Sequence, residues 1–482
     1  MLKLTDPSLL RDRAYIGGVW TEATNRKPVH NPANGALIAE VADVGVVGAR
    51  AAIDAAATAF PAWSAKTARE RSAILIEWNR LMLDSADDLA RILTAEMGKP
   101  FAEARGEILY GASFIEWFAQ EARRVYSDVI PGSLADKRIL VLKQPIGVAA
   151  AITPWNFPNA MVARKAGPAL AAGCTFVLRP AELTPLSALA MAALGERAGL
   201  PAGVFNVVTS ADSSGVGQEF CANPKVRKIS FTGSTRVGSI LMRQAAEGIK
   251  KLSLELGGNA PFIVFDDADL DMAVEGALIA KFRNAGQTCV CANRLYVQRG
   301  VFAAFADKLA GAVGKLTVGD GAEPGVQIGP LISPAALAKV EAHVADALAH
   351  GAKATIGGKR HPAGALFYEP TVLVGADSAM KIAHEETFGP VAPLFAFDTV
   401  EDVIAMANDT EFGLASYFYA RDLGRVWKVA EALEYGMVGV NTGLISTAEA
   451  PFGGVKASGI GCEGSKYGAD EYLTLKYVCL SV

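Results

Sequence analysis

Apolar residues follow two different spacings along the chain. Over residues 46–63 and 68–97, alanine and leucine recur at helical intervals with few turn residues, which predicts a long helix over each range. Short apolar runs then alternate with helical stretches, as is typical of βαβ units in a mainly parallel sheet. The strands predicted in this part are 146–152, 175–178, 204–208 and 228–231, and the helices are 185–198 and 237–247.

The alternation starts again in the second half of the chain. Apolar runs at 261–264 and 371–374 predict strands, and residues 301–313 and 334–350 predict helices. These elements indicate a second α/β domain.

Two segments fit neither domain. Residues 136–144 (DKRILVLKQ) and 471–482 (EYLTLKYVCLSV) mix β-branched and charged residues in the manner of edge strands. We expect them to pair with another strand, such as one from a second subunit. An ordinary exposed hairpin explains the pattern equally well.

Length and charge narrow the class of protein. A chain of 482 residues exceeds what one hydrophobic core supports, so two or three domains are expected. A net charge of −4 with both signs mixed offers no basic surface to nucleic acid or to an anionic membrane. The chain starts without the layout of a signal peptide and has no apolar run long enough to cross a bilayer. We therefore expect a cytoplasmic protein with neither nucleic acid nor membrane as a partner.

The six cysteines are too few and too scattered for a disulfide scaffold, and none has zinc-ligand spacing, so no metal is expected. Cys289 stands apart because it lies in a polar, glycine-containing turn within FRNAGQTCVCANR (282–294). A lone cysteine is more often a small buried hydrophobe. Polar neighbours and backbone amides favour the thiolate, so Cys289 is a candidate nucleophile if a base lies nearby.

Three other short segments could complete such a site. Glu255 interrupts an apolar run in LSLELGGNA (252–260), and burial would raise its pKa toward that of a general base, although a salt-bridged structural glutamate is commoner. Asn156 lies between two prolines in TPWNFP (153–158), where its amide could donate to an oxyanion or simply form a turn. The turn SFTGSTRVG (230–238) could present amides to a pyrophosphate, but it lacks the G-x-G-x-x-G spacing.

Taken together and in order, TPWNFP, FTGST, LELGGNAP, GQTCVCANR, EETFGP and PFGGVKASG resemble the aldehyde dehydrogenase superfamily across nearly the whole chain. The resemblance implies an α/β protein with a Rossmann-like NAD-binding domain (1–125 and 146–255) and an α/β catalytic domain (256–450). It also implies a small β oligomerisation arm (126–145 and 466–482), and hence a homo-oligomer, a dimer or a tetramer.

The resemblance also implies roles for single residues. Cys289 would attack the aldehyde carbon, Asn156 and the Cys289 amide would hold the oxyanion, and Glu255 would activate water. Lys165 and Glu463 match positions that relay protons from that glutamate. The residues expected at the cofactor are Thr153, Pro154, Trp155, Arg179, Glu182, Gly233, Ser234, Leu256, Glu386 and Phe388.

Cofactor choice depends on the loop RPAELTP (179–185), which the family places beside the adenine ribose. Glu182 can accept hydrogen bonds from ribose hydroxyls but would repel a 2′-phosphate, which favours NAD over NADP. Arg179, where the family usually has lysine, could bind a phosphate or pair with Glu182.

Within the superfamily, the segments NFPNAMVARKAGPALAAGC and KFRNAGQTCVCANR most resemble succinate-semialdehyde dehydrogenases. That resemblance implies that succinic semialdehyde is oxidised to succinate and that Arg164, Arg283 and Ser446 bind its carboxylate. Guanidinium groups suit a carboxylate in a partly dry pocket, although either arginine could instead be structural.

Two further cysteines lie beside candidate site residues. Cys291 is two residues from Cys289, near the upper limit of disulfide reach, so we consider both a reversible oxidative switch and plain packing. Cys462 stands next to Glu463 where the family usually has arginine, with no consequence that the sequence reveals.

Other functions stay open. The same chemistry could act on glutaric semialdehyde or on a neutral aliphatic aldehyde, because one methylene changes discrimination only modestly. A non-catalytic binding protein on the same fold is disfavoured because Cys289, Glu255 and Asn156 are all present.

Overall fold

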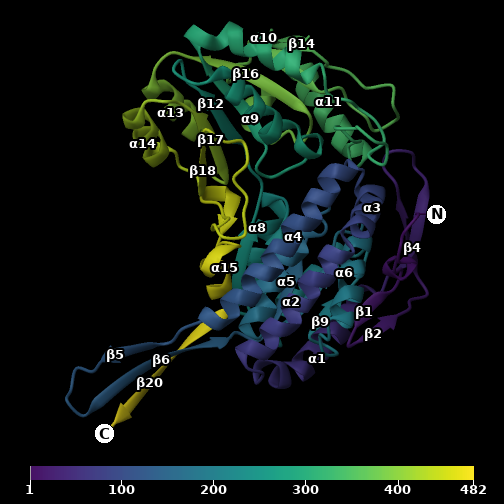
Figure 1. Cartoon of the computed structure of the whole chain (residues 1–482), viewed down its shortest axis with the longest axis vertical. Helices are drawn as coiled ribbons and strands as arrows, with labels where there is room; N and C mark the ends of the chain where they lie inside the picture. The colour runs from purple at the N-terminus through teal and green to yellow at the C-terminus, as the bar shows by residue number, and fades with distance from the viewer. Residues whose placement is uncertain (1) are drawn as a thin grey trace.

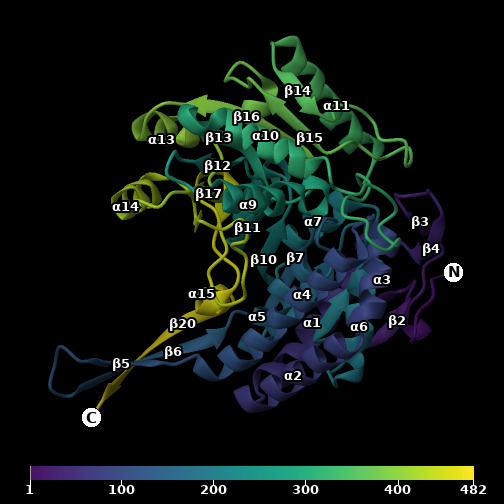
Figure 2. The ribbon, with the colours of Figure 1, turned by 45° about the horizontal axis from the view of Figure 1, so that its top comes forward.

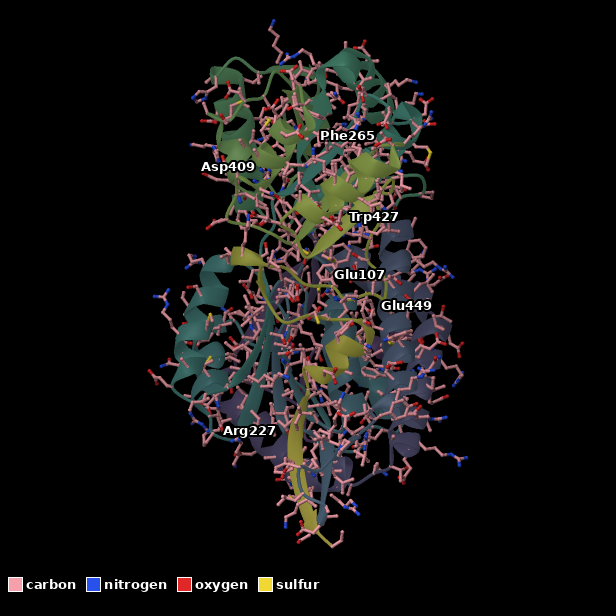
Figure 3. All side chains as sticks on the ribbon, turned by 90° about the vertical axis from the view of Figure 1, so that its left-hand side faces the viewer. Glu107, Arg227, Phe265, Asp409, Trp427 and Glu449 are labelled. Atoms are coloured by element: carbon pink, nitrogen blue, oxygen red, sulfur yellow. The ribbon has the colours of Figure 1, made fainter. Side chains whose placement is uncertain are left out.

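The computed structural model describes residues 2–482, and their strands form four sheets. Figure 1 shows two α/β lobes, one above the other, and an arm that projects from the lower lobe and carries the C-terminus. The lower lobe is built mainly from the first half of the chain and the upper lobe from the second half (Figures 1 and 2). Seen from the side, Arg227 belongs to the lower lobe and Phe265 and Asp409 to the upper one (Figure 3).

The lower lobe contains an eight-stranded sheet in the order β19–β11–β10–β7–β8–β9–β1–β2. Strands β7 to β11 run parallel, and β1 and β19 join them antiparallel. The strands are β1 (Ala14–Ile16), β2 (Val19–Thr21), β7 (Val148–Ile152), β8 (Thr175–Arg179), β9 (Phe205–Val207), β10 (Val226–Thr232), β11 (Lys251–Glu255) and β19 (Gly459–Ile460).

Helices cover both faces of this sheet. Alternate side chains on β7 and β8 point to opposite faces and are apolar on both, so each face packs against its own layer of helices. Ala149, Ala151 and Phe176 pack with α2 to α6, whereas Ala150 and Val177 pack with α1, α7 and α8. The helices are α1 (Gly45–Ser64), α2 (Ala68–Asp84), α3 (Ala86–Met97), α4 (Phe101–Glu121), α5 (Ala160–Ala172), α6 (Leu186–Arg197), α7 (Ser213–Ala222) and α8 (Thr235–Ala246).

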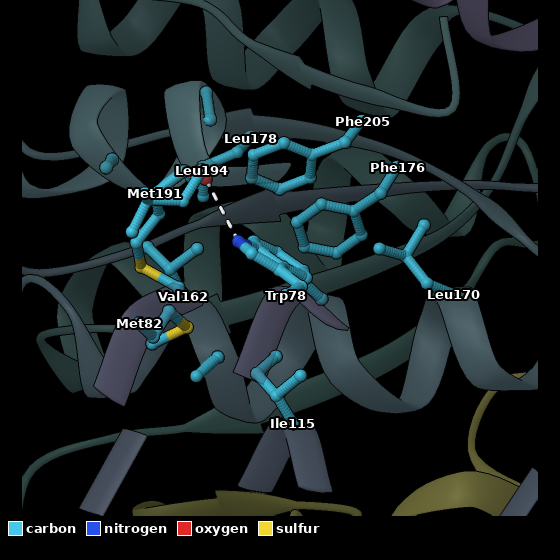
Figure 4. Packing of buried hydrophobic residues seen from close by; sticks show 14 of the residues in the cluster. Trp78, Met82, Ile115, Val162, Leu170, Phe176, Leu178, Met191, Leu194 and Phe205 are labelled. Carbon is cyan, nitrogen blue, oxygen red and sulfur yellow. Dashed lines mark hydrogen bonds between the residues drawn. The ribbon is translucent and has the colours of Figure 1, made fainter. Parts of the chain in front are cut away.

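Trp78 of α2 lies at the centre of the larger of these two cores (Figure 4). Its ring packs edge-on against Phe205 at 5.3 Å, and its Nε1 donates to the Met191 carbonyl at 3.1 Å. Because the indole is both buried and hydrogen-bonded, truncation to alanine should cost about 3–5 kcal/mol of stability.

The upper lobe contains a seven-stranded sheet in the order β14–β15–β16–β13–β12–β17–β18, parallel except for β14. Helices α9 and α10 cover one face, and α13 and α14 cover the other. The strands are β12 (Ala260–Val264), β13 (Ala292–Gln298), β14 (Lys353–Ile356), β15 (Thr371–Val374), β16 (Val391–Phe397), β17 (Ala415–Tyr419) and β18 (Met437–Val440). The helices are α9 (Leu270–Phe282), α10 (Phe302–Val313), α11 (Pro334–Ala349), α12 (Lys381–His384), α13 (Val400–Asn408) and α14 (Leu423–Ala432).

The arm is a three-stranded antiparallel sheet of β5 (Asp128–Pro131), β6 (Lys137–Pro145) and β20 (Leu473–Ser481). The two segments expected to be edge strands therefore pair with each other, Lys137 opposite Ser481 and Pro145 opposite Leu473. The remaining pair, β3 (Arg26–His30) with β4 (Leu37–Ala42), lies by the N-terminus, and α15 (Ser465–Asp470) precedes β20.

The predicted elements agree with this structure except between residues 68 and 97, where one long helix was expected. The chain forms two helices there, which meet at Ser85 with φ −99° and ψ 13°. Asp87 and Asp88 occupy the first turn of α3, where carboxylates favour a new helix start. The Asp88 carboxylate also accepts from the Thr5 and Asp6 amides, which ties this start to the N-terminal segment. In residues 2–482, no helix is both long and apolar enough to span a membrane.

Candidate active site

Cys289 lies in a tightly folded loop between α9 and β13. Asn284, Ala285 and Gly286 all have positive φ, at 53°, 53° and 75°. Two consecutive residues other than glycine in this region are strained, and such strain gathers at functional loops that the surrounding structure holds in place. The turn leaves Cys289 partly exposed at the boundary of two cavities of about 280 and 260 Å³.

The loop TPWNFP meets this turn. The Asn156 side chain is buried, and its Nδ2 donates to the Gln287 carbonyl at 3.1 Å. In return, the Asn284 Nδ2 donates to the Asn156 carbonyl at 3.2 Å. The candidate oxyanion donor and the candidate nucleophile are therefore held within one hydrogen-bonded unit.

The segment LELGGNAP lies against the same loop. A Cβ on Gly258 would lie 2.4 Å from the Cys289 carbonyl oxygen, and a Cβ on Gly257 would lie 3.2 Å from Glu386 Oε2. The Gly258 amide also donates to Glu386 Oε1 at 3.2 Å. Only glycine permits this approach at position 258. The Glu255 segment is thereby brought beside the nucleophile.

The Glu255 carboxyl group is buried at the end of β11, and neither of its oxygens has a hydrogen-bond partner among the described residues. Burial, reinforced by repulsion from Glu463, raises its pKa well above the usual value for a glutamate. A buried carboxyl without a structural partner and with a raised pKa has the properties of a general base.

Glu463 is ion-paired with two buried cations from α5. The Arg164 Nε lies 2.7 Å from Glu463 Oε2, and the Lys165 Nζ bonds Glu463 Oε1. Burial opposes ionisation, but Lys165 and Arg164 lower the pKa of Glu463 below its usual value. Lys165 Nζ also donates to Ser230 Oγ at 3.1 Å. Two carboxyl groups with opposite shifts in pKa are thus neighbours, as proton transfer between acid and base requires.

The first cavity contains the residues expected to bind a carboxylate. Arg164, Arg283 and Ser446 all line it with Cys289. The Arg164 guanidinium lies 3.8 Å from the centre of the Phe452 ring, and that of Arg283 lies 5.4 Å from the Phe157 ring. Burial raises the pKa of the Cys289 thiol to about 12, and Arg164 opposes the increase. The cavity therefore combines the two guanidinium groups with an apolar wall, which suits an aldehyde that carries an anion.

The second cavity is lined by most of the residues expected at the cofactor. Trp155 and Phe388 meet edge-on there, with ring centres 5.5 Å apart, and Phe388 has φ 57°. Ser234 caps the N-terminus of α8. Burial raises the pKa of Glu386 to about 7. The expected residues that line this cavity with Cys289 are Pro154, Trp155, Gly233, Ser234, Leu256, Glu386 and Phe388.

Three expected cofactor residues lie outside this lining. Thr153 is buried and its amide donates to the Arg179 carbonyl at 3.2 Å. Arg179 pairs with the exposed Glu182 at 2.7 Å and also donates to the Ser210 carbonyl and to Ser213 Oγ. The pairing considered from the sequence is therefore formed through the Arg179 Nη2, whereas the buried Arg179 Nε has no hydrogen-bond partner among the described residues.

All six cysteines are free thiols, including Cys291 and Cys462, the two that lie beside candidate site residues. Cys291 is buried, and its Sγ lies 3.3 Å from the Lys281 Nζ, while Cys289 faces the cavities. A switch between the two cysteines would require Cys291 to leave Lys281. Cys462 is half-buried, and burial raises the pKa of its thiol to about 11.

Several residues in the two cavities were not predicted from the sequence. Lys99, Glu103, Glu107 and Tyr110 line the first cavity, and Lys339 of α11 lines the second. Each belongs to a helix or a helix connection without a motif of its own. The one signal in the sequence is that Glu103 and Glu107 are charged at positions that otherwise fit the buried side of α4.

Comparison with known proteins places this geometry in a family. The family model described as "Aldehyde dehydrogenase family" matches residues 20–478. The chain is 63% identical to a succinate-semialdehyde dehydrogenase of Escherichia coli (strain K12) named for NADP(+), over 100% of both chains. It is 62% identical to a glutarate-semialdehyde dehydrogenase of Pseudomonas aeruginosa, over 99% of each.

Solved structures agree. A crystal structure of a succinate-semialdehyde dehydrogenase from Burkholderia pseudomallei has a TM-score of 0.99 and 61% identity, and each chain covers 100% of the other. Members of this family oxidise small aldehydes with NAD or NADP. The chain belongs to the aldehyde dehydrogenase family.

Proposed function

We propose that this enzyme oxidises succinic semialdehyde to succinate through a thioester on Cys289. The observation that carries the proposal is the cavity of about 280 Å³ in which Arg164 and Arg283 share the lining with Cys289. Two guanidinium groups in a largely apolar cavity bind and orient a carboxylate. The names of close relatives support the same substrate class, since they include succinate- and glutarate-semialdehyde dehydrogenases.

In the first half of the reaction, Cys289 Sγ bonds to the aldehyde carbon and forms a thiohemiacetal. The oxyanion that develops takes hydrogen bonds from the Asn156 amide and the Cys289 backbone N–H. Burial raises the pKa of the Cys289 thiol, and the positive charge of Arg164 lowers it in part. The Arg164 charge therefore favours the thiolate, which is the reactive form. A nicotinamide bound in the second cavity would supply the hydride acceptor.

In the second half, Glu255 removes a proton from water, and the resulting hydroxide attacks the thioester carbon. The C–S bond breaks, succinate leaves and the Cys289 thiolate is restored. Glu463, which the Lys165 ammonium holds by an ion pair, then takes the proton from its neighbour Glu255 and passes it on. The pKa of Glu255 is raised and that of Glu463 is lowered, so Glu255 accepts a proton from water more readily than Glu463 does.

The second cavity suits a nicotinamide nucleotide. It adjoins Cys289, and it combines the Trp155 and Phe388 rings with the half-buried Glu386 carboxyl, which could accept from ribose hydroxyls. We propose NAD as the preferred cofactor, with NADP less favoured. The family resemblance puts the adenine ribose beside Glu182, whose negative charge would repel a 2′-phosphate, and Arg179 Nη2 bonds both Glu182 and Ser213.

A related aldehyde is the second candidate. Glutaric semialdehyde is one methylene longer and carries the same carboxylate, and relatives 62% identical to this chain are named for it. Neutral aliphatic aldehydes would leave Arg283 without an anionic partner, which disfavours them. A non-catalytic role is disfavoured by the unpaired Glu255 carboxyl beside the nucleophile loop.

We also propose that the enzyme is a homo-oligomer, a dimer or a tetramer, which assembles through the arm in residues 126–145 and 466–482. Val129, Leu475 and Tyr477 of the arm are exposed, and apolar strands of this kind need cover. The remaining domain boundaries, 1–125 with 146–255 and 256–450, and the cytoplasmic location stay predictions.

The function is tested by initial rates of NADH or NADPH formation with succinic semialdehyde, glutaric semialdehyde and butyraldehyde. The expected result is the highest kcat/KM with succinic semialdehyde and NAD. Arg283→Ala should remove the advantage over butyraldehyde. If butyraldehyde is equal or better for the wild type, the carboxylate pocket is refuted and the enzyme is a general aldehyde dehydrogenase.

A further inference from the structure

A fully buried ion pair lies behind the loop that carries Asn156. Lys99 connects α3 to α4, Glu107 lies on α4, and their side chains are 1% and 0% exposed. Lys99 Nζ lies 2.5 Å from Glu107 Oε2. A buried ion pair often contributes little net stability, because desolvation of both charges offsets their attraction. Its remaining hydrogen bonds therefore indicate what it does.

Those hydrogen bonds all go to the segment from Asn156 to Ala160. Lys99 Nζ donates to the Asn156 carbonyl at 2.9 Å and lies 3.6 Å from the centre of the Phe157 ring. Glu107 Oε1 accepts from the Asn159 amide at 3.0 Å and from the Ala160 amide at 3.2 Å. The ion pair thus contacts the segment at its start, through Asn156 and Phe157, and at its end, through Asn159 and Ala160.

Helix α5 depends on this contact. Asn159 is its N-cap residue, yet its side chain makes no capping hydrogen bond. Glu107 accepts from the first amides of the helix instead, and its negative charge suits the positive end of the helix dipole. Helix α4 can come close enough because a Cβ on Gly111 would lie 2.4 Å from Asn159 Oδ1.

The Asn156 side chain has few contacts of its own. Its Oδ1 is buried with no hydrogen-bond partner among the described residues, and its Nδ2 has one, the Gln287 carbonyl. The backbone carbonyl of Asn156, in contrast, accepts from both Lys99 and Asn284. The position of the amide is therefore set through the backbone, and Lys99 supplies the charge-assisted bond.

We propose that Lys99 and Glu107 are positioning residues that place the Asn156 amide for the oxyanion, an inference that rests on the proposed function of Asn156. Lys99 also lines the first cavity, so the rival interpretation is that it binds the substrate carboxylate directly. Its Nζ, however, already has the Glu107 carboxylate, the Asn156 carbonyl and the Phe157 ring as partners.

The two interpretations differ in substrate dependence. A positioning residue acts on the oxyanion, which every aldehyde forms, so Lys99→Met should lower kcat/KM by a similar factor for succinic semialdehyde and for butyraldehyde. The expected factor is about 10- to 100-fold, since small misplacement in an active site costs up to about 10²-fold. A carboxylate-binding lysine would affect succinic semialdehyde alone.

A double-mutant cycle shows whether Lys99 acts through Asn156. Asn156→Ala should lower kcat/KM by about 10²-fold. In that background, Lys99→Met should change kcat/KM by less than about 3-fold, because the amide that it positions is gone. Lys99→Met/Glu107→Gln is studied in parallel, because it leaves no buried unpaired carboxylate that would unfold the protein.

The matched control is another buried lysine over an aromatic ring. Lys228 Nζ lies 3.2 Å from Glu471 Oε2 and 5.0 Å from the centre of the Tyr472 ring. Any effect of Lys228→Met/Glu471→Gln should multiply with that of Asn156→Ala, since it makes no contact with the loop.

Each outcome is decisive. Non-additivity of the Lys99 and Asn156 changes, with equal losses for both aldehydes, supports the positioning role. Full additivity, or a loss confined to succinic semialdehyde, overturns it. If Asn156→Ala itself leaves kcat/KM unchanged, the proposed oxyanion donor fails, and that failure is distinct from the failure of Lys99 alone.

Discussion

The Arg164 Nε lies 2.7 Å from Glu463 Oε2, and both side chains are buried. The arginine that faces the substrate cavity is therefore also a partner of the carboxylate proposed to take up protons. Arg283 lines the same cavity but forms no salt bridge within residues 2–482. The two arginines should respond differently to substitution.

Arg164→Met should destabilise the enzyme by about 3–5 kcal/mol, because it breaks a buried ion pair. Arg283→Met should cost less than about 1.5 kcal/mol, since this side chain is partly exposed and its charge has no ion-pair partner there. Both variants should lose the preference for succinic semialdehyde over butyraldehyde. Urea unfolding and the ratio of kcat/KM values for the two aldehydes measure the two effects. Equal losses of stability would show that the Glu463 contact is unimportant.

The raised pKa of Glu255 predicts opposite effects of pH on activity and stability. Activity requires the carboxylate, so kcat should rise with pH through the folded-state pKa, and Glu255→Gln should abolish turnover while still permitting one equivalent of NADH per subunit. A quenched-flow burst followed by no steady-state rate is the expected trace. A variant that turns over normally would exclude Glu255 as the base.

Stability follows from the same shift by linkage. The folded state holds the Glu255 proton above the usual pKa of 4.5, where the unfolded chain has released it, so rising pH favours unfolding. Glu255→Gln should therefore be more stable than wild type near pH 7, and the difference should shrink as pH falls toward 4.5. Thermal unfolding at several pH values tests this. A difference that does not vary with pH would contradict the raised pKa.

Cofactor preference should depend on the Arg179–Glu182 pair. Glu182→Ala removes the repulsive charge and frees the Arg179 guanidinium, so kcat/KM for NADP should rise by about 3- to 10-fold relative to NAD. Arg179→Met is the matched change, and it should lower NADP use further. Initial rates with both cofactors measure the ratio. No change in either variant would place the 2′-phosphate elsewhere.

The possible redox switch gives a different kind of prediction. Reversible inactivation by peroxide requires Cys291 to leave Lys281 and form a disulfide with Cys289. Cys291→Ala should then be inactivated irreversibly, whereas dithiothreitol should restore most wild-type activity. Equal recovery of both proteins would show that Cys291 only packs.

The sequence predicts the parts of the site that lie in short, distinctive segments. Cys289, Glu255 and Asn156 each interrupt a local pattern, by a polar turn, a charge in an apolar strand or a pair of prolines. Lys99 and Glu107 could not be predicted in the same way. Their roles depend on how α4 lies across the start of α5, a contact that no local pattern describes.

The sheets show the same difference: strands can be predicted from local periodicity, but the pairing of distant strands cannot. The alternation of residues predicts most strands of both lobes, because burial on one or both faces leaves a periodic pattern. The pairing of β6 with β20 could not be predicted from the local pattern, since Lys137 and Ser481 meet only through the tertiary fold, and the family resemblance alone implied that the two segments form one arm. The break at Ser85 was missed because helical residues continue on both sides of it.

The sheet of the lower lobe has β2 at one edge and β19 at the other, formed by residues 19–21 and 459–460. During translation, the residues of β2 are synthesised near the start and the residues of β19 near the end. Until then β11, which carries Glu255 and pairs with β10 on one side, has an unpaired edge on the other side, in a nascent chain whose upper lobe is already complete. Chaperones that protect strand edges should therefore stay bound late, and messages truncated before residue 459 should yield protein that is degraded rather than partly active.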